Sequence, residues 1–305
     1  MFHAVGWTFP WAVTAVRGLH VTVRKVEYGK IWQILREYRI THFNAAPTVN
    51  TNLCAHPDAK RLPKEVRVTV AASPPSATLF ERMISLNLIP IHVYGLTETY
   101  GPAVRSYYNP QWNSLPDAER YQRMARQGHG WLVGKSVRVV RGAGDEFIDV
   151  NKDGKDIGEI VFQGNSNMSG YLDAKKATDA AFEGNYFHSG DLAVLHPDNT
   201  IQILDRKKDM FISGGENVSS IDVENAIMAH PAVLEAAVIG VPDEKWGEVG
   251  RAFLTLSQQG LQMTDLKAWL KSRIAGYKIP RDFIVVHDLP KNGTNKVVKT
   301  KLRNL

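Results

Sequence analysis

A strand-like pattern that runs directly into a polar loop constrains the fold of this chain most. Apolar residues occupy every second position of Ile89–Val93, which predicts a strand, and the run YGLTETYG at Tyr94–Gly101 follows it. In open α/β sheets, ligands bind at the carboxyl ends of the strands. Hydroxyls and backbone amides can hold a phosphate there, and a carboxylate can hold its Mg²⁺. Taken alone, such a loop is also compatible with a plain turn.

Helix and strand signals alternate along the first third of the chain. Alternating apolar residues predict strands at 19–23, 41–46 and 66–70. Helical spacing predicts a helix over 31–38, and Pro75 opens another. This order predicts an α/β fold in which helices cover a mainly parallel sheet.

The middle of the chain is poorer in helix signals. Residues 105–130 are polar and predict an excursion with a short helix at 117–126. Residues 132–204 predict a small β subdomain, because turn signals separate short alternating runs. The expected strands lie at 136–141, 146–150, 159–163 and 200–204.

The last hundred residues predict a separate α+β module. A helix is expected from Ser219 or Ser220, where Asp222 completes an approximate capping box, and Thr264 is expected to cap a second helix. Strands are expected at 236–241, 252–256 and 283–286.

These patterns predict three parts along the chain. Residues 1–204 form a larger part that includes the β subdomain 132–204. Residues 205–209 form a charged link, and residues 210–305 form a small α+β C-terminal module.

Composition excludes several classes of function. The 305 residues carry a net charge of +6, but the basic residues are spread out, and no nucleic-acid-binding pattern occurs. No apolar run is long enough to span a bilayer, and the apolar N-terminus is interpreted as an internal segment, not a signal peptide. Cys54 is the only cysteine, which fits a reducing compartment. We expect an intracellular protein, cytoplasmic or peroxisomal, although the last three residues lack the usual peroxisomal pattern.

Four further segments carry residues suited to nucleotide chemistry. They are VAASPP at 70–75, FHSGD at 187–191, LDRKKDMFISGGENVSSIDVE at 204–224 and PKNGTNKVVK at 290–299. Small residues let a flat base approach the backbone, and an aspartate accepts hydrogen bonds from ribose hydroxyls. Taken singly, these segments are also compatible with routine turns, a charged linker and a solvated lysine.

Together with the YGLTETYG run, these segments resemble, in the same order, the motifs of the AMP-forming acyl-CoA synthetases in the adenylate-forming superfamily. Within this family, the sequence most resembles the fungal and plant acyl-activating group. The resemblance implies that ATP, Mg²⁺ and CoA are used to activate a fatty or other carboxylic acid through an acyl-adenylate. It departs from the family at His188-Ser189, where Arg-Thr is usual, and at Asn295, where glycine is usual. Glycine is also commoner in the segment that contains Ala72.

The resemblance also implies residue roles. Lys296 and Thr97 are catalytic, and Glu98 is catalytic and holds the metal. Gly214, Gly215 and Glu216 bind CoA, and His3, Trp7 and Gly95 line the acyl pocket. The resemblance further implies that residues 1–204 are a partial AMP-binding large domain, that residues 205–209 are a hinge with Lys208 as its pivot, and that residues 210–305 are a C-terminal lid domain. The ATP- or AMP-binding residues are Ala72, Ser73, Tyr94, Gly95, Thr97, Asp191, Arg206 and Lys296.

One element of the family has no match in this sequence. The Ser/Thr/Gly-rich loop that wraps the β- and γ-phosphates would lie upstream of the segment that contains His3, so the chain is interpreted as truncated at its N-terminus. One hypothesis is a ligase represented by a fragment. The alternative is a noncatalytic remnant that binds nucleotide or a protein partner. In either case we expect the sheet of residues 1–94 to have an exposed edge.

Overall fold

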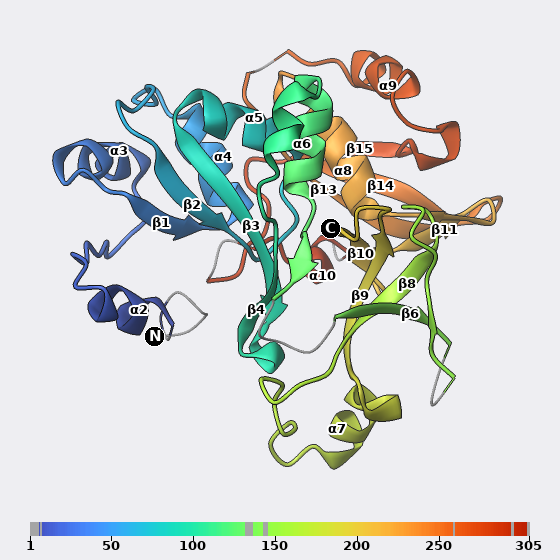
Figure 1. Cartoon of the computed structure of the whole chain (residues 1–305). Coiled ribbons are helices and arrows are strands. Elements are labelled where there is room, and N and C mark those ends of the chain that lie inside the picture. Colours follow the sequence, from blue (N-terminus) through green and yellow to red (C-terminus); the bar gives the residue numbers. More distant parts are fainter. Residues whose placement is uncertain are drawn as a thin grey trace. The chain divides into compact units, whose positions relative to one another are not determined.

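The computed structural model describes residues 6, 8–131, 137–142, 146–258, 260–293 and 296–303. The chain divides into two compact units. The first comprises Met1–Ser189 and Ala193–Gln202, and the second comprises Gly190–Leu192 and Ile203–Leu305. Figure 1 shows their elements, and each unit is described by itself.

The first unit is built on a mixed five-stranded sheet with the order β1-β2-β3-β4-β5. β1 pairs with β2 and β2 with β3 in parallel, whereas β4 and β5 are antiparallel additions. The α/β class is confirmed, as are the strands expected at 41–46, 66–70 and 89–93. The strands are β1 (His42–Ala45), β2 (Val66–Val70), β3 (Leu88–Leu96), β4 (Gly101–Arg105) and β5 (His129–Gly130).

Helices of this unit pack on the sheet and on one another. α5 (Ala77–Ser85) and α6 (Asp117–Ala125) contact β3, while α4 (Pro47–Ala55) contacts α5 and α3 (Tyr28–Glu37). The helices expected over 31–38 and 117–126 are therefore confirmed. The helix expected from Pro75 begins two residues later, because the Ser76 hydroxyl accepts a hydrogen bond from the Leu79 amide and caps it.

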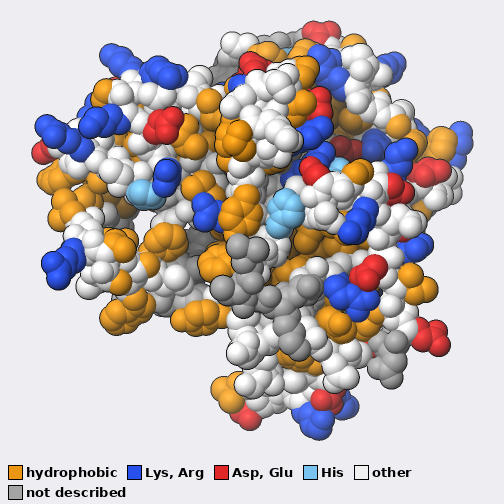
Figure 2. Space-filling view, viewed as in Figure 1, with side chains coloured by type: hydrophobic (Ala, Val, Ile, Leu, Met, Phe, Trp, Pro, Cys, Tyr) orange, Lys and Arg blue, Asp and Glu red, His pale blue; other side chains and the backbone are white. Residues whose placement is uncertain are grey.

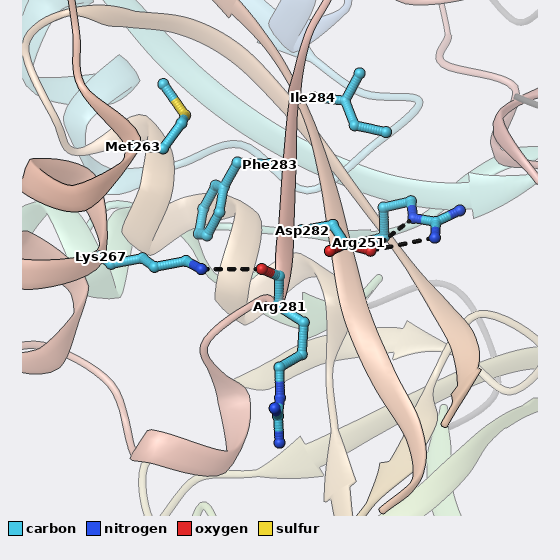
Figure 3. A pocket seen from close by; sticks show the side chains of 7 residues that line it. All are labelled: Arg251, Met263, Lys267, Arg281, Asp282, Phe283 and Ile284. Carbon is cyan, nitrogen blue, oxygen red and sulfur yellow. Dashed lines mark hydrogen bonds and ion pairs between the residues drawn. The ribbon is translucent and has the colours of Figure 1, made fainter. Parts of the chain in front are cut away.

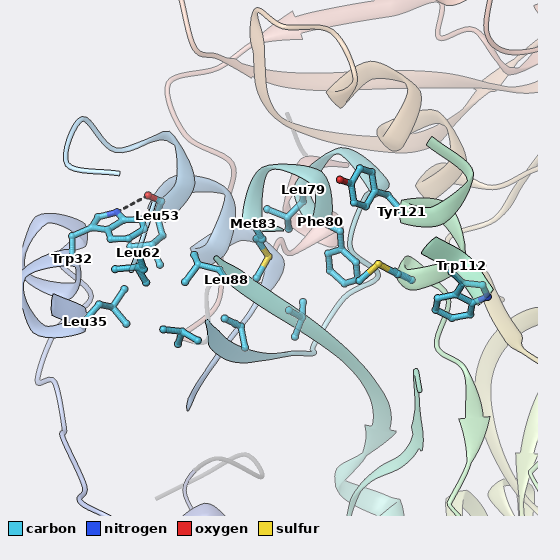
Figure 4. Packing of buried hydrophobic residues seen from close by; sticks show 14 residues of the cluster. Trp32, Leu35, Leu53, Leu62, Leu79, Phe80, Met83, Leu88, Trp112 and Tyr121 are labelled. Carbon is cyan, nitrogen blue, oxygen red and sulfur yellow. Dashed lines mark hydrogen bonds between the residues drawn. The ribbon is translucent and has the colours of Figure 1, made fainter. Parts of the chain in front are cut away.

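An apolar core joins these helices to the sheet (Figure 4). Trp32, Phe80, Met83 and Leu88 are fully buried in it, and the Trp32 indole N–H donates to the Leu53 carbonyl oxygen at 2.9 Å. Burial of each large apolar side chain stabilises the fold by roughly 1.5–3 kcal/mol. This core fixes β3, the strand that leads into the YGLTETYG loop.

The strand expected at 19–23 is wrong. The segment between α2 (Phe9–Ala15) and α3 has no strand, and the side chains of Leu19 and Val23 are 76% and 47% exposed. Apolar alternation marks a strand only where a neighbouring strand pairs with it and one face is covered. Hydrophobic side chains reach the surface around α2, where Trp11 is 69% exposed (Figure 2).

A second sheet has the order β10-β9-β8-β6-β7, and its strands β9 and β10 contain residues of both units. The four short strands expected here are present, and α7 (Lys175–Ala181) and β9 were not expected. The strands are β6 (Arg138–Arg141), β7 (Ile148–Asp149), β8 (Ile157–Phe162), β9 (Phe187–Leu195) and β10 (Ile201–Arg206).

The second unit contains a sheet with the order β12-β11-β14-β13, and β15 pairs in parallel with β14. Its helices are α8 (Ser220–Met228), α9 (Met263–Lys271) and α10 (Lys299–Leu302). Its strands are β11 (Phe211–Ser213), β12 (Glu216–Val218), β13 (Val233–Asp243), β14 (Gly247–Leu256) and β15 (Asp282–Val285).

The two expected helix caps of this unit have different outcomes. Ser219 caps α8, because its hydroxyl accepts from the Asp222 amide at 3.1 Å. The expected cap at Thr264 is wrong, since α9 begins at Met263 and places Thr264 inside its first turn. The residue before the helix, Gln262, makes no side-chain cap bond.

Candidate nucleotide-binding site and catalytic loop

The loop after β3 is a turn of 3-10 helix, Thr97–Thr99, held by a buried hydroxyl. Thr99 Oγ1 accepts from the Leu96 amide at 3.0 Å and donates to the Gly101 carbonyl at 2.9 Å. Thr97, by contrast, is exposed. Thr99 therefore shapes the loop, and Thr97 is the threonine that can reach a ligand.

Glu98 is oriented by a segment that sequence reasoning missed. The Tyr171 hydroxyl donates to Glu98 Oε1 at 3.1 Å, and the Met168 amide donates to the Glu98 carbonyl at 2.7 Å. Partial burial and the Glu98 carboxylate raise the pKa of Tyr171 above its usual value, so this donor keeps its proton. The Glu98 carboxylate and the exposed hydroxyl of Thr97, its neighbour in the chain, are oxygen ligands of the kind that Mg²⁺ prefers, so these residue types fit the expected metal.

A hollow of about 450 Å³ adjoins this loop. Thr97, Tyr100 and residues 165–169 line it, so amide and hydroxyl groups dominate its wall. Such groups can donate to phosphate oxygens. The GNSNMSGY run that supplies this wall was overlooked because its polar residues carry no charge.

Packing gives Gly95 a structural role of its own. A Cβ atom at Gly95 would lie 1.9 Å from the Gly101 carbonyl oxygen on β4, which no side chain tolerates. Gly95 and Tyr94 lie in the last residues of β3.

In the segment expected to bind adenine, the exposed Ala72 has a φ of +84°, a conformation that glycine adopts without strain.

Asp191 and Arg206 meet where β9 runs beside β10. The Lys207 amide donates to the Gly190 carbonyl at 2.9 Å, which places the two side chains together. Arg206 Nε lies 3.6 Å from Asp191 Oδ1, and Asp191 is 7% exposed. An aspartate so held can accept from ribose hydroxyls.

The departures at His188 and Ser189 have structural partners. His188 Nδ1 lies 3.3 Å from Glu159, and its other ring nitrogen contacts the Glu183 carbonyl at 3.2 Å. The Ser189 hydroxyl donates to the Ile160 carbonyl at 2.7 Å. Both side chains therefore tie β9 to its surroundings, and the aspartate two residues later keeps its position.

Lys296 lies in the same unit as Asp191 and Arg206. Burial is the main cause that lowers the pKa of Lys296 to about 8, and the nearby Arg206 adds to the shift. Asp191 and Asp209 act in the opposite direction. A lysine with this pKa is still mostly protonated at neutral pH, so it can stabilise negative charge on a phosphate.

The expected CoA-binding segment is a β-hairpin turn. Gly214 and Gly215 have φ values of +62° and +86° between the paired residues Ser213 and Glu216. Positive φ at both central residues is typical of a type I′ turn, which favours two glycines. The Gly214 amide donates to the Trp246 carbonyl at 2.9 Å, and a Cβ at Gly214 would lie 2.7 Å from the Trp246 ring. The turn itself thus requires these glycines.

The structure describes the predicted pivot but not two of the predicted acyl-pocket residues. The Lys208 carbonyl accepts from Arg303 at 3.3 Å, and Arg303 also lies 3.5 Å from Asp209. His3 and Trp7 lie outside the described residues. Ser73 is half-buried between β2 and α5.

A second hollow, of about 550 Å³, lies in the second unit (Figure 3). Its cationic side chains already have partners. Arg251 lies 3.1 Å from Asp282, and Lys267 donates to the Arg281 carbonyl at 3.0 Å. In the part of the chain that the structure describes, no group of three or more His, Cys, Asp or Glu residues could hold a metal ion. None of the helices described there combines the length and apolar character needed to cross a membrane.

Two family profiles match the chain. The profile of the AMP-binding enzymes matches residues 1–172, and that of the AMP-binding enzyme C-terminal domain matches residues 222–296. The chain therefore belongs to the AMP-binding enzyme family.

Relatives and solved structures agree with this assignment. The peroxisomal acetate/butyrate–CoA ligase of Arabidopsis thaliana is 40% identical over 313 residues, which cover 99% of this chain and 54% of the relative. An acetate–CoA ligase of Humulus lupulus is 41% identical over the same shares. The chain thus spans about half the length of these relatives.

Solved structures of adenylate-forming enzymes share the fold. An o-succinylbenzoate CoA synthetase of Bacillus subtilis, solved with its acyl-adenylate intermediate, has a TM-score of 0.82 at 26% identity. It matches over 99% of this chain and 58% of its own. ATP-bound MatB from Rhodopseudomonas palustris has the same TM-score at 27% identity and the same shares.

Proposed function

We propose that this chain carries the adenylate-binding and C-terminal parts of an AMP-forming carboxylate–CoA ligase. The observation that carries the proposal is the cluster of Asp191, Arg206 and Lys296 in one compact unit. It combines a ribose acceptor with cations suited to a phosphate. The alternative of a noncatalytic remnant is not favoured, since the relatives are named as ligases.

The reaction has two halves. A substrate carboxylate oxygen attacks the α-phosphorus of ATP, the bond to the β-phosphate oxygen breaks, and pyrophosphate leaves. The CoA thiol, after losing its proton, then attacks the acyl carbon, and AMP leaves with the bonding electrons. Mg²⁺, when bound, neutralises phosphate charge in the first half.

The residues of the chain would divide these tasks. The Lys296 ammonium stabilises the negative charge that grows on the α-phosphate and carboxylate oxygens. Asp191 accepts from the ribose hydroxyls, with Arg206 beside it, while Thr97 contacts phosphate and Glu98 holds Mg²⁺. Ala72, Ser73 and Tyr94 border the adenine, and Gly95 lies between the nucleotide and the acyl pocket that His3 and Trp7 would line.

The C-terminal part would also serve the second half-reaction. The narrow turn at Gly214–Glu216 lets the pantetheine arm of CoA approach the backbone, and Lys208 is the pivot of the hinge 205–209 between 1–204 and 210–305. We propose a small aliphatic acid as substrate, because relatives are named for acetate, butyrate and 2-methylpropanoate. We also propose an intracellular location, cytoplasmic or peroxisomal; two Arabidopsis relatives are named as peroxisomal, which supports the second of these.

Calorimetric titration of the 305-residue chain with AMP tests the proposal. We expect saturable binding that Asp191→Ala abolishes and that Asp282→Ala, a matched acid in the same unit, leaves intact. Pyrophosphate exchange over acetate, butyrate and longer acids then defines the substrate in the complete protein. Absence of AMP binding by a folded chain would contradict the assignment of the site.

A further inference from the structure

The loop that carries Lys296 has a closed hairpin stem. Lys291 and Val297 form an antiparallel bridge, and the Val298 amide donates to the Pro290 carbonyl at 2.8 Å. Across the stem, the Asn292 amide donates to the Lys296 carbonyl at 2.9 Å, and the Lys296 amide donates to Asn292 Oδ1 at 3.0 Å. The backbone of Lys296 is thus fixed relative to the two ends of the stem.

The first end is anchored by a buried ion pair. Lys291 Nζ donates to both carboxylate oxygens of Glu235, at 2.9 and 2.7 Å. Glu235 lies on β13, the last strand in the order of the sheet of the second unit, and its side chain is only 8% exposed. The bidentate contact therefore ties the stem to a rigid strand.

The second end is anchored by another buried ion pair. Lys299 Nζ lies 2.7 Å from Glu224 Oε1 on α8 and also contacts the Ser220 hydroxyl. Glu224 Oε1 accepts from the Val238 amide at 2.8 Å, and Asp205 accepts from the Ser220 amide at 2.6 Å. Burial opposes charge on Lys299, but Glu224 and Asp205 outweigh it and raise the pKa of Lys299, so the cation persists.

Stability alone gives little reason for two such pairs. Replacing a buried ion pair with apolar residues of similar volume is often neutral or stabilising, because both charges lose their hydration. A buried pair with several hydrogen bonds instead fixes the relative position and orientation of the two segments that it joins. The two lysines stand on either side of Lys296 in the chain, at 291 and 299, and their two carboxylates lie on different elements of the unit, α8 and β13.

The Lys296 ammonium needs such support. Arg206 and Lys208 repel it, and burial removes its hydration. Without a bound phosphate, the ammonium would regain hydration and reduce its repulsion from Arg206 and Lys208 by moving toward solvent. A loop whose two ends were not held would allow that movement.

We propose that the Lys291–Glu235 and Lys299–Glu224 pairs are positioning pairs that hold the backbone of Lys296 in place; their importance for adenylation rests on the function proposed above. Neither pair is required to touch substrate. The four residues hold the backbone of the stem, and the backbone in turn determines the position of the Lys296 ammonium.

Trace acetylation of the 305-residue chain, followed by mass spectrometry over pH 6–11, measures the titration of Lys296 without any need for catalysis. In the unmodified chain we expect a midpoint of about 8. In Glu224→Gln and Glu235→Gln, the loop loosens, and the midpoint rises by at least about one unit, so labelling at pH 7 falls roughly tenfold. Lys299→Arg, which keeps the cation, should retain the midpoint of the unmodified chain.

Asp222→Asn is the matched control. Asp222 lies on α8 like Glu224 and forms an ion pair with Lys278 at 2.6 Å, outside the stem, so the midpoint should not move. If circular dichroism shows that a single variant does not fold, the Lys296 midpoint is measured in the double variant Glu235→Leu with Lys291→Met. This variant removes the ion pair without leaving an unpaired buried charge. Folded variants that keep the midpoint of the unmodified chain would overturn the proposal.

A second measurement separates this inference from the proposed function. In the complete protein, the same variants should lower kcat for pyrophosphate exchange about tenfold while thioester formation from supplied acyl-adenylate continues. If labelling shifts but exchange is unchanged, the positioning role stands and the catalytic role of Lys296 is wrong. If exchange falls without a labelling shift, the positioning role is wrong.

Discussion

The unusual pKa of Lys296 predicts how nucleotide affinity depends on pH. The pKa is lowered from the ordinary 10.5 to about 8, so the ammonium that we propose contacts phosphate is lost in a range where other lysines stay charged. With that pKa, about nine-tenths of the chains carry the charge at pH 7 and about one-tenth at pH 9. AMP affinity should therefore be highest below pH 8 and fall as pH rises through it.

The magnitude follows from the strength of a charged hydrogen bond. A contact between an ammonium and phosphate contributes roughly 1.5–3 kcal/mol, or about 10- to 100-fold in Kd. Between pH 7 and pH 9.5 we expect the Kd for AMP to rise at least about fivefold, with a slope that begins near pH 8. Bound phosphate favours the charged form, so the midpoint should move upward as AMP saturates the chain.

Isothermal titration calorimetry between pH 6.5 and 9.5 measures the effect in the 305-residue chain. Lys296→Met should show weak binding at every pH, and Lys296→Arg should restore binding with a flat profile, because a guanidinium keeps its proton. Lys278→Met is the control, since Lys278 pairs with Asp222 away from the cluster. A pH-independent Kd in the unmodified chain, or an equal decline in Lys296→Met, would refute the reasoning.

Three further predictions concern the loops around the site. Ala72→Gly should raise the free energy of urea unfolding by about 1 kcal/mol, because φ is +84° at this position, whereas Ala77→Gly at the start of α5 should not raise it; an equal rise in both variants would contradict the strain at Ala72. Thr99→Val should cost about 1–3 kcal/mol by leaving the Leu96 amide without its acceptor, and Thr99→Ser should restore most of it; a stable Thr99→Val would show that the hydroxyl is dispensable. Lys208→Pro locks φ and should leave pyrophosphate exchange of the complete protein largely intact while impairing thioester formation; unchanged rates in both steps would place the pivot elsewhere.

Local sequence patterns predicted the first sheet well where pairing and burial followed the pattern. The alternation of Val66, Val68 and Val70 identified β2 because those three side chains are buried between neighbours on both sides. The same alternation at Leu19 and Val23 failed, because no strand pairs with that segment in the described chain. Periodicity records a preference for a covered face, but the cover itself comes from residues far away in the sequence.

The candidate site shows a similar limit. Resemblance to the family's motifs singled out Asp191, Arg206 and Lys296, and the structure places them in one unit. It could not identify Glu224, Glu235 or Tyr171, because each acts through a partner 56 to 75 positions away: Lys299, Lys291 or Glu98. A glutamate within an apolar strand such as β13 is a usable signal, since a buried carboxylate requires a cation. Matching it to Lys291 requires the fold.

Glycines at the site show why residue identity and residue role must be separated. Gly95 is required by β4, and Gly214 and Gly215 are required by a hairpin turn, before any ligand is considered. A turn without Cβ atoms leaves the peptide accessible, so the ligand approach that we propose there would be a consequence of these requirements. Substituting these glycines would therefore damage folding and binding together. The charged residues Asp191, Arg206 and Lys296 separate the two effects, because their side chains can be changed while the backbone that carries them is held by Gly190, the β9–β10 pairing and the two anchored ends of the loop.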